Sequence, residues 1–166
     1  MNLKAALDMD ASGIGRKFVD ADGKTALMVA ALHDHSDCLK LLLYAPKKRG
    51  SDNFQVYETS NDGTTVLMWA VIGSSEESVR ELLRAGADVS VYGPKRITAL
   101  FLASRLGLSS IAKILLDAGA DIEAQNADGA TPLLAAVSNG HEECTVLLLE
   151  YNANLKHKDK VRKLLT

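Results

Sequence analysis

Aromatic residues, cysteines and long apolar runs are all scarce in this 166-residue chain. Phe, Trp and Tyr together make up 5% of it, which disfavours a strand-rich core, because strands prefer aromatic and β-branched residues. The two cysteines, Cys38 and Cys144, are far apart in the chain, so we expect both to be buried free thiols. No apolar stretch typical of a secretory leader opens the sequence, which favours a reducing compartment. No run approaches the ~18 apolar residues that would span a bilayer. The formal net charge of −2 is too small to recruit nucleic acid or an anionic membrane by itself.

The chain contains instead a unit that is repeated four times. Its most regular feature is a threonine, at positions 25, 65, 98 and 131, with separations of 40, 33 and 33 residues. An Asp-Gly pair precedes three of these threonines, and an alanine follows each of them five residues later. The alanines are Ala30, Ala70, Ala103 and Ala136. A leucine-rich stretch comes later in each unit, and such self-similarity is typical of a solenoid of stacked repeats.

Each unit predicts a turn, a short helix, a second turn and a longer helix. The Asp-Gly pair suits a tight turn, and the threonine can cap the helix that begins beside it. Pro132 fits the first position of such a helix. Gly86 and Gly119 follow the second helices, where we expect left-handed backbone. The fixed alanines mark the places where two helices approach closely, so the predicted fold class is all-α.

On these residues the chain resembles the ankyrin-repeat family, whose 33-residue unit carries Thr-Pro-Leu-His, a Gly-His turn and a closing Gly-Ala-Asp. The resemblance covers Asp20 to Lys160 and implies a solenoid of stacked helix-turn-helix units with projecting turns. The family histidine is absent from all four units, and we expect apolar packing to replace its hydrogen bonds. The residues in its place are Met28, Met68, Phe101 and Leu134. Lys95 and Arg96 stand where the third unit should have Asp-Gly, which predicts a distorted turn.

We treat the chain as one domain that consists of several units. Residues 1–19 form a degenerate N-terminal capping unit, and residues 160–166 form a partial or capping unit at the other end. The four repeats between them are 20–60, 61–93, 94–126 and 127–159. Residues 3–7 predict the second helix of the capping unit. The first repeat holds an insertion around 47–59, either a loop whose apolar end packs on the stack or a finger that contacts a partner. The last segment is either a short cap or the beginning of a further repeat.

Three short motifs suggest other chemistry, but each is incomplete. The stretch from Asp8 to Gly13 resembles the front of a calcium-binding loop, yet Val19 stands where the bidentate glutamate is needed. Residues 13–17 lack the spacing and the Ser or Thr of a phosphate-binding loop. His33 and His35 do not share a helix face, and we expect them in a turn. No nucleophile with a recognisable base and acid is present, so we expect no catalytic residues, no metal and no cofactor.

The resemblance implies that a partner binds the concave side, which consists of the turn tips and the exposed side of the first helices. By the period, the candidate partner-binding residues are Asn61, Trp69, Ile72, Tyr92, Lys95, Arg105, Leu106, Gln125, Asp128, Ser138 and Asn139. Further positions on this face are Lys24, Leu32, His33, Thr59, Thr64, Ile97 and Leu102. Trp, Tyr and Arg are typical of binding hot spots, although Trp69 is equally compatible with filling space between first helices. We expect Tyr92 and Arg105 to be exposed.

The prediction for function is a non-catalytic protein-interaction module, an adaptor or part of a scaffold. We expect a protein partner of mixed polar and apolar character, a monomeric state and a cytoplasmic location, with a nuclear one left open, and no small-molecule substrate. Two basic clusters, 47–49 and 156–163, are either solvated surface or a site for an acidic partner. The alternative function is therefore a nucleic-acid or anionic-lipid binder that uses the tail and the insertion, and its binding would fall steeply with salt.

Overall fold

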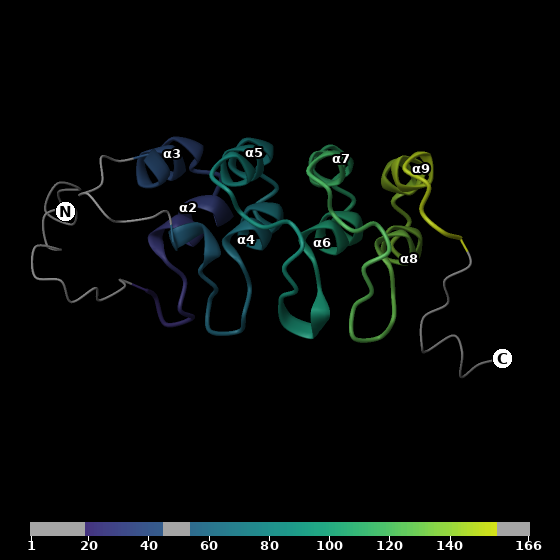
Figure 1. Cartoon of the computed structure of the whole chain (residues 1–166), viewed down its shortest axis with the longest axis horizontal. Coiled ribbons are helices and arrows are strands. Elements are labelled where there is room, and N and C mark those ends of the chain that lie inside the picture. Colours follow the sequence, from purple (N-terminus) through teal and green to yellow (C-terminus); the bar gives the residue numbers. More distant parts are fainter. Residues whose placement is uncertain (1–18, 45–53, 156–166) are drawn as a thin grey trace, which may run out of the picture.

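The computed structural model describes residues 19–44 and 54–155, in which eight α-helices form two parallel rows (Figure 1). One row holds the first helices of the repeats, α2 (Ala26–Leu32), α4 (Val66–Ile72), α6 (Ala99–Leu106) and α8 (Pro132–Ser138). The other holds the second helices, α3 (Ser36–Tyr44), α5 (Glu76–Arg84), α7 (Ser109–Asp117) and α9 (Glu142–Glu150). Two 3₁₀ helices, η1 (Phe54–Tyr57) and η2 (Pro94–Arg96), lie in the connecting loops. This part of the chain is thus an all-α stack of helix pairs, as predicted.

The four repeated threonines cap the first helices. Each hydroxyl accepts a hydrogen bond from the amide of the third residue that follows, at 3.2 to 3.4 Å. A cap of this kind stabilises a helix by about 1 kcal/mol. Pro132 occupies the first turn of α8. The predicted helix starts are therefore confirmed.

Left-handed backbone ends both kinds of helix. Gly86 and Gly119 follow α5 and α7 with φ of 93° and 88°, as predicted. A second left-handed residue recurs in the turn after each first helix, at Asp34, Ser74, Gly107 and Gly140. Two of the four are not glycine, and Asp and Ser hold this conformation at some cost in backbone energy.

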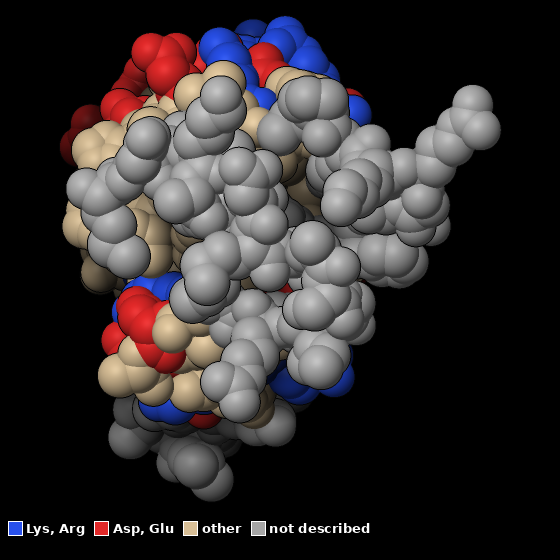
Figure 2. Space-filling model, turned by 90° about the vertical axis from the view of Figure 1, so that its left-hand side faces the viewer, with Lys and Arg blue, Asp and Glu red and all other residues tan. Residues whose placement is uncertain are grey.

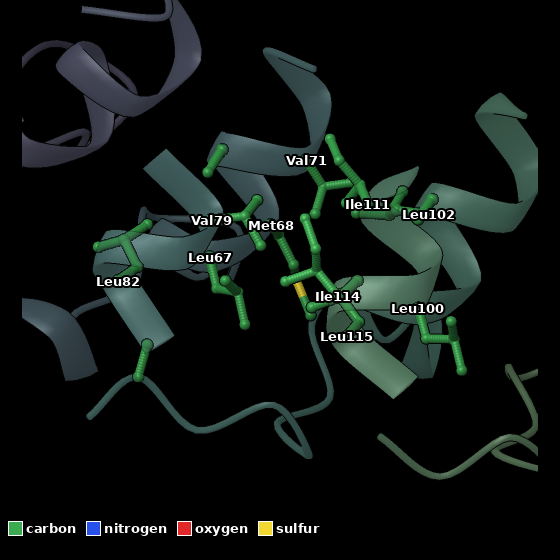
Figure 3. Packing of buried hydrophobic residues seen from close by; sticks show 14 of the residues in the cluster. Leu67, Met68, Val71, Val79, Leu82, Leu100, Leu102, Ile111, Ile114 and Leu115 are labelled. Carbon is green, nitrogen blue, oxygen red and sulfur yellow. The ribbon is translucent and has the colours of Figure 1, made fainter. Parts of the chain in front are cut away.

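The core is a seam that runs between the rows. Ala70, Ala103 and Ala136 have no exposed surface, which lets neighbouring helices approach closely. Met68 lies at the family-histidine position and is 1% exposed, so apolar packing replaces the histidine there. Figure 3 shows side chains of the second and third repeats meeting between their helices, among them Val71 and Ile111. Because each repeat buries its apolar residues against its neighbours, a single repeat cannot bury its apolar face alone.

A buried carboxylate connects helices α3 and α5. Glu81 is 7% exposed, at a position where α7 has Ile114. Its carboxylate accepts a hydrogen bond of 2.9 Å from the Tyr44 hydroxyl and pairs with Arg84 Nη1 at 2.5 Å. The Tyr44 hydrogen bond is the main reason that the pKa of Glu81 lies below its ordinary value. An otherwise costly buried charge is therefore stabilised by partners.

The two cysteines do not share an environment, so the prediction of two buried thiols is wrong for Cys38. Cys144 has no exposed surface and burial raises the pKa of its thiol, whereas Cys38 is exposed. Each is the third residue of its second helix. At that position a side chain packs toward the preceding repeat. Helix α3 is the first helix of its row in the part of the chain that is described. Figure 2 views this end of the stack, where acidic and basic side chains are interspersed along the upper edge of the view.

The insertion contributes to the core at its apolar end. Val56, in η1, is 3% exposed and belongs to the hydrophobic core, whereas Tyr57 is 62% exposed. The packing alternative is thus confirmed for Val56. Both basic clusters, the capping segments 1–18 and 160–166 and the calcium-loop and phosphate-loop motifs lie outside the described residues. Within residues 19–44 and 54–155, no helix is long and apolar enough to cross a membrane.

Candidate functional site

Four hairpin loops project from the row of first helices, on the side away from the second helices (Figure 1). We call residues 19–25, 59–65, 92–98 and 125–131 the first to fourth fingers. Each is closed by a backbone hydrogen bond of 2.8 to 3.1 Å from the fifth residue before the capping threonine to the residue just before that threonine. The four fingers therefore share one closing hydrogen bond, and their tips lie along one edge of the stack (Figure 1).

Main-chain hydrogen bonds join some neighbouring fingertips but not all. The amide of Asn61 donates to the carbonyl of Asp22 at 3.0 Å, and the amide of Ala127 donates to the carbonyl of Lys95 at 2.8 Å. The equivalent donor in the third finger would be residue 94, which is a proline and has no N–H. No backbone bond between the second and third fingers is found in the described residues. The tips therefore form two bonded pairs with a break at Pro94.

The third fingertip is the one that departs from the common turn. Lys95 and Arg96 have φ of 54° and 56°, and the other three fingers have left-handed glycine at the position of Arg96. Left-handed backbone costs a side-chain-bearing residue about 1–2 kcal/mol. The guanidinium of Arg96 stacks on Tyr92, 4.5 Å from the ring centroid, which offsets part of this cost. The predicted distortion is confirmed, and it holds two cations at the tip.

Trp69 has one side in the core and one side against the first two fingers. The ring is half-buried and packs on the hydrophobic core. Its Nε1 donates to Ser60 Oγ at 3.2 Å, and Lys24 Nζ lies 5.2 Å from the ring centroid. Lys24 is itself paired with Asp22, whose hydrogen bond raises the pKa of the lysine. Trp69 therefore supports the first two fingers from behind, and part of its ring remains exposed.

Exposed apolar side chains lie in the third finger and at the C-terminal ends of α4 and α6. Ile72 ends α4 and is 39% exposed, Tyr92 is 41% exposed, and Leu106 ends α6 and is 44% exposed. Arg105 is exposed beside Leu106, and its carbonyl is bonded to Nε2 of His141 at 2.9 Å. The expected exposure of Tyr92 and Arg105 is confirmed. Apolar groups and cations thus occur together on the second and third repeats.

The other candidates are exposed, but two of them also have structural hydrogen bonds. Asn61 Nδ2 donates to the carbonyl of Ala21 at 3.2 Å and strengthens the first pair of fingers. Asn139 Nδ2 donates to the carbonyl of Ala135 at 2.8 Å, at the end of α8. Gln125, Asp128 and Ser138 are exposed on the fourth repeat.

Two further positions were placed on the concave side wrongly. Thr64 is 6% exposed, because its hydroxyl donates to the Asp62 carboxylate within the turn at 3.0 Å. Leu102 is 6% exposed, because it packs in the core. His33 and His35 lie in the turn between α2 and α3, as expected. The residues that are described contain no group of three His, Cys, Asp or Glu that could hold a metal ion.

Comparison with known proteins identifies the family. A family model described as "Ankyrin repeats (3 copies)" matches residues 3–93 and 91–159. The chain belongs to the ankyrin-repeat family. The ankyrin repeat protein nuc-2 of Neurospora crassa is 30% identical to this ankyrin-repeat chain over 149 residues, which are 90% of the chain but 13% of that relative. The chain thus spans a small part of the relative's length. Ankyrin repeats generally mediate protein–protein interaction.

Proposed function

We propose that this ankyrin-repeat chain is a non-catalytic module that binds a segment of another protein through its fingers and the exposed ends of its first helices. The observation that supports this most is the third finger, where a strained tip presents cations beside exposed apolar side chains. Strained backbone clusters at ligand clamps and other functional sites, which makes this tip a candidate contact point. A monomeric state and a cytoplasmic location remain predictions.

The chemistry of this surface favours a partner segment that combines apolar side chains with carboxylates. Ile72, Tyr92 and Leu106 offer apolar contact area, and rigid aromatic groups are typical anchors of binding energy. Lys95 and Arg105 offer donors to a carboxylate, and a planar guanidinium can bind one through two hydrogen bonds. The exposed Asp128 in the fourth finger disfavours a polyanionic partner, because like charges repel.

The test compares the proteins that variants retain from a lysate and then measures the affinity of the purified partner by calorimetry. Tyr92→Ala with Arg105→Ala should weaken that affinity by about tenfold to hundredfold, since hot-spot side chains contribute about 1–3 kcal/mol. Lys113→Ala is the matched control, because Lys113 is exposed on α7, in the opposite row of helices. Both proteins should keep the wild-type circular dichroism. If the double variant binds as the wild type does, the proposed surface is wrong.

The same calorimetry distinguishes the alternative function. Binding that survives the Tyr92 and Arg105 changes, falls steeply between low and high salt and is lost on nuclease treatment would indicate a nucleic acid held by the basic clusters. Binding that depends on the third finger and varies little with salt would support a protein segment.

A further inference from the structure

An open groove lies between α7 and α9, on the outer side of the row of second helices. Its volume is about 630 Å³, and we call it the outer groove. Val146 is 54% exposed within it, and Leu147 is half-buried and packs on the hydrophobic core. The row to which α7 and α9 belong lies opposite the fingers (Figure 1). The outer groove is therefore separate from the surface that the third finger provides.

The side of the groove that α9 forms differs in charge from the other second helices. Helix α9 contains three exposed carboxylates and no cation, and all three carboxylates line the groove. They belong to Glu142, Glu143 and Glu150. Val146 lies among them, at a position where each of the other second helices has a cation. These cations are Lys40, Arg80 and Lys113. An exposed apolar side chain thus replaces the positive charge that would balance the carboxylates.

The equivalent groove between α3 and α5 is bridged by its own side chains. Lys40 Nζ lies 2.6 Å from Glu77 Oε1. In the outer groove the same two repeat positions are occupied by Lys113 and Glu143. No ion pair joins them in the part of the chain that the structure describes. The carboxylates of α9 are therefore available to a cation from another molecule.

We propose that the outer groove binds a basic amphipathic helix of a partner protein. A helix can lie in the groove between two packed helices, and its apolar face would then cover Val146 and Leu147. Lys or Arg side chains along the edge beside α9 would form charge-assisted hydrogen bonds with the carboxylates. Lys113 on the α7 side favours a neutral or acidic edge, so the groove also selects the orientation of the bound helix.

Other ligands fit the outer groove less well. Nucleic acid and anionic lipid are disfavoured, because the three carboxylates of α9 would repel them. A small molecule is disfavoured as well, since small-molecule sites enclose most of the ligand surface, whereas most residues that line this groove are exposed. The combination of exposed apolar side chains and unpaired carboxylates matches a basic amphipathic helix in both respects.

Titration of the full chain with synthetic peptides, followed by amide chemical shifts, tests the proposal. The probe is a peptide of leucine and lysine with leucines at helical spacing, about 14 residues long, which exceeds the ~14 Å length of the nine-residue helix α9. One comparison peptide has glutamate in place of lysine, and another has the same composition without helical spacing. We expect saturable shifts in α7 and α9 with the first peptide alone, and unchanged shifts in the fingers.

A pair of valine variants tests whether the outer groove is the site. Val146→Lys restores the cation of the other repeats and should weaken binding of the basic peptide about tenfold, because it removes an apolar contact and adds a like charge. The matched control is Val137→Lys, since Val137 is 51% exposed on α8, does not line the groove and gains the same charge. The control should bind as the wild type does. If Val146→Lys alters the circular dichroism, Glu142→Gln with Glu143→Gln replaces it and should weaken binding about threefold.

Three results would overturn the proposal. The first is equal weakening by Val146→Lys and Val137→Lys, which would indicate attraction by overall charge. The second is equal binding of the peptide without helical spacing, which would exclude recognition of an amphipathic helix. The third concerns the basic segment 156–163 of the chain itself. If Lys156→Gln, Lys158→Gln and Lys160→Gln together change the shifts of α9 without peptide, that segment covers the groove, whereas unchanged shifts support a partner.

Discussion

Replacement of Gly107 by alanine should loosen the contact between the third and fourth repeats. Gly107 has φ of 72°, and an added Cβ would lie 2.5 Å from Nδ1 of His141. Left-handed alanine costs about 1–2 kcal/mol. His141 must also move and lose its hydrogen bond to the carbonyl of Arg105, which contributes about 1 kcal/mol. We therefore expect Gly107→Ala to lower the free energy of unfolding by about 2–3 kcal/mol.

The control for this variant is Gly119→Ala. Gly119 has a similar φ of 88°, but nothing lies within 4 Å of an added Cβ. Both substitutions change the entropy of the unfolded chain equally, so that effect cancels in the comparison. The difference of about 1 kcal/mol between the two variants then measures the His141 contact alone.

Urea denaturation followed by far-ultraviolet circular dichroism gives both free energies. When measured against His141→Ala alone, Gly107→Ala should cost about as much as Gly119→Ala, because the hydrogen bond and the clashing ring are already absent there. Equal destabilisation by Gly107→Ala and Gly119→Ala, within ~0.5 kcal/mol, would refute the reasoning, since backbone strain would then account for the whole effect.

Three further predictions concern buried contacts elsewhere in the stack. Ser104 Oγ is buried, and the weak thiol of Cys144 is its one neighbour with hydrogen-bonding capacity among the described residues. Ser104→Ala should therefore raise the urea midpoint, by up to about 1 kcal/mol of stability, and a lower midpoint would contradict this. Gly73 has an ordinary φ, but an added Cβ would lie 2.4 Å from the carbonyl oxygen of Leu32. Gly73→Ala should therefore lower the free energy of unfolding by about 1–3 kcal/mol through overpacking, and an unchanged urea midpoint would exclude the clash. The pKa of Glu81 is lowered, mainly by Tyr44, so its stabilisation is present above the ordinary pKa of 4.5 and is lost as pH falls through the lower folded value. Glu81→Gln should therefore reduce the stability at neutral pH, and the stability of this variant should fall less steeply than that of the wild type below pH ~4.5. Acid titrations monitored by circular dichroism test this, and an unaltered pH profile would show that the carboxylate is not coupled to folding.

Local chemistry made the repeat predictable. Threonine caps and left-handed glycines depend on a few neighbouring residues, so the helix starts and Gly86 follow from sequence spacing alone. The distorted turn at Lys95 was predictable for the same reason, because two residues that are not glycine replace Asp-Gly.

Burial and hydrogen bonds that depend on contacts between neighbouring repeats could not be predicted from the sequence in the same way. Cys38 and Cys144 occupy one position of the repeat, yet Cys38 is exposed and Cys144 is buried beside Ser104 of the preceding repeat. Leu102 takes the place of Trp69 one repeat later, yet the larger ring is half-buried and the leucine is in the core. The Asn61 side chain bonds another finger, a role that its position at a turn tip does not indicate.

The proline at position 94 has a consequence for how far neighbouring fingertips can separate. Widening the edge between the first and second tips breaks the Asn61 bonds, and widening it between the third and fourth breaks the bond of Ala127. Between Asp62 and Pro94 the described chain has no such bond to break. A bulky ligand would therefore spread the hairpins at this one place, and each neighbouring pair would move as a unit.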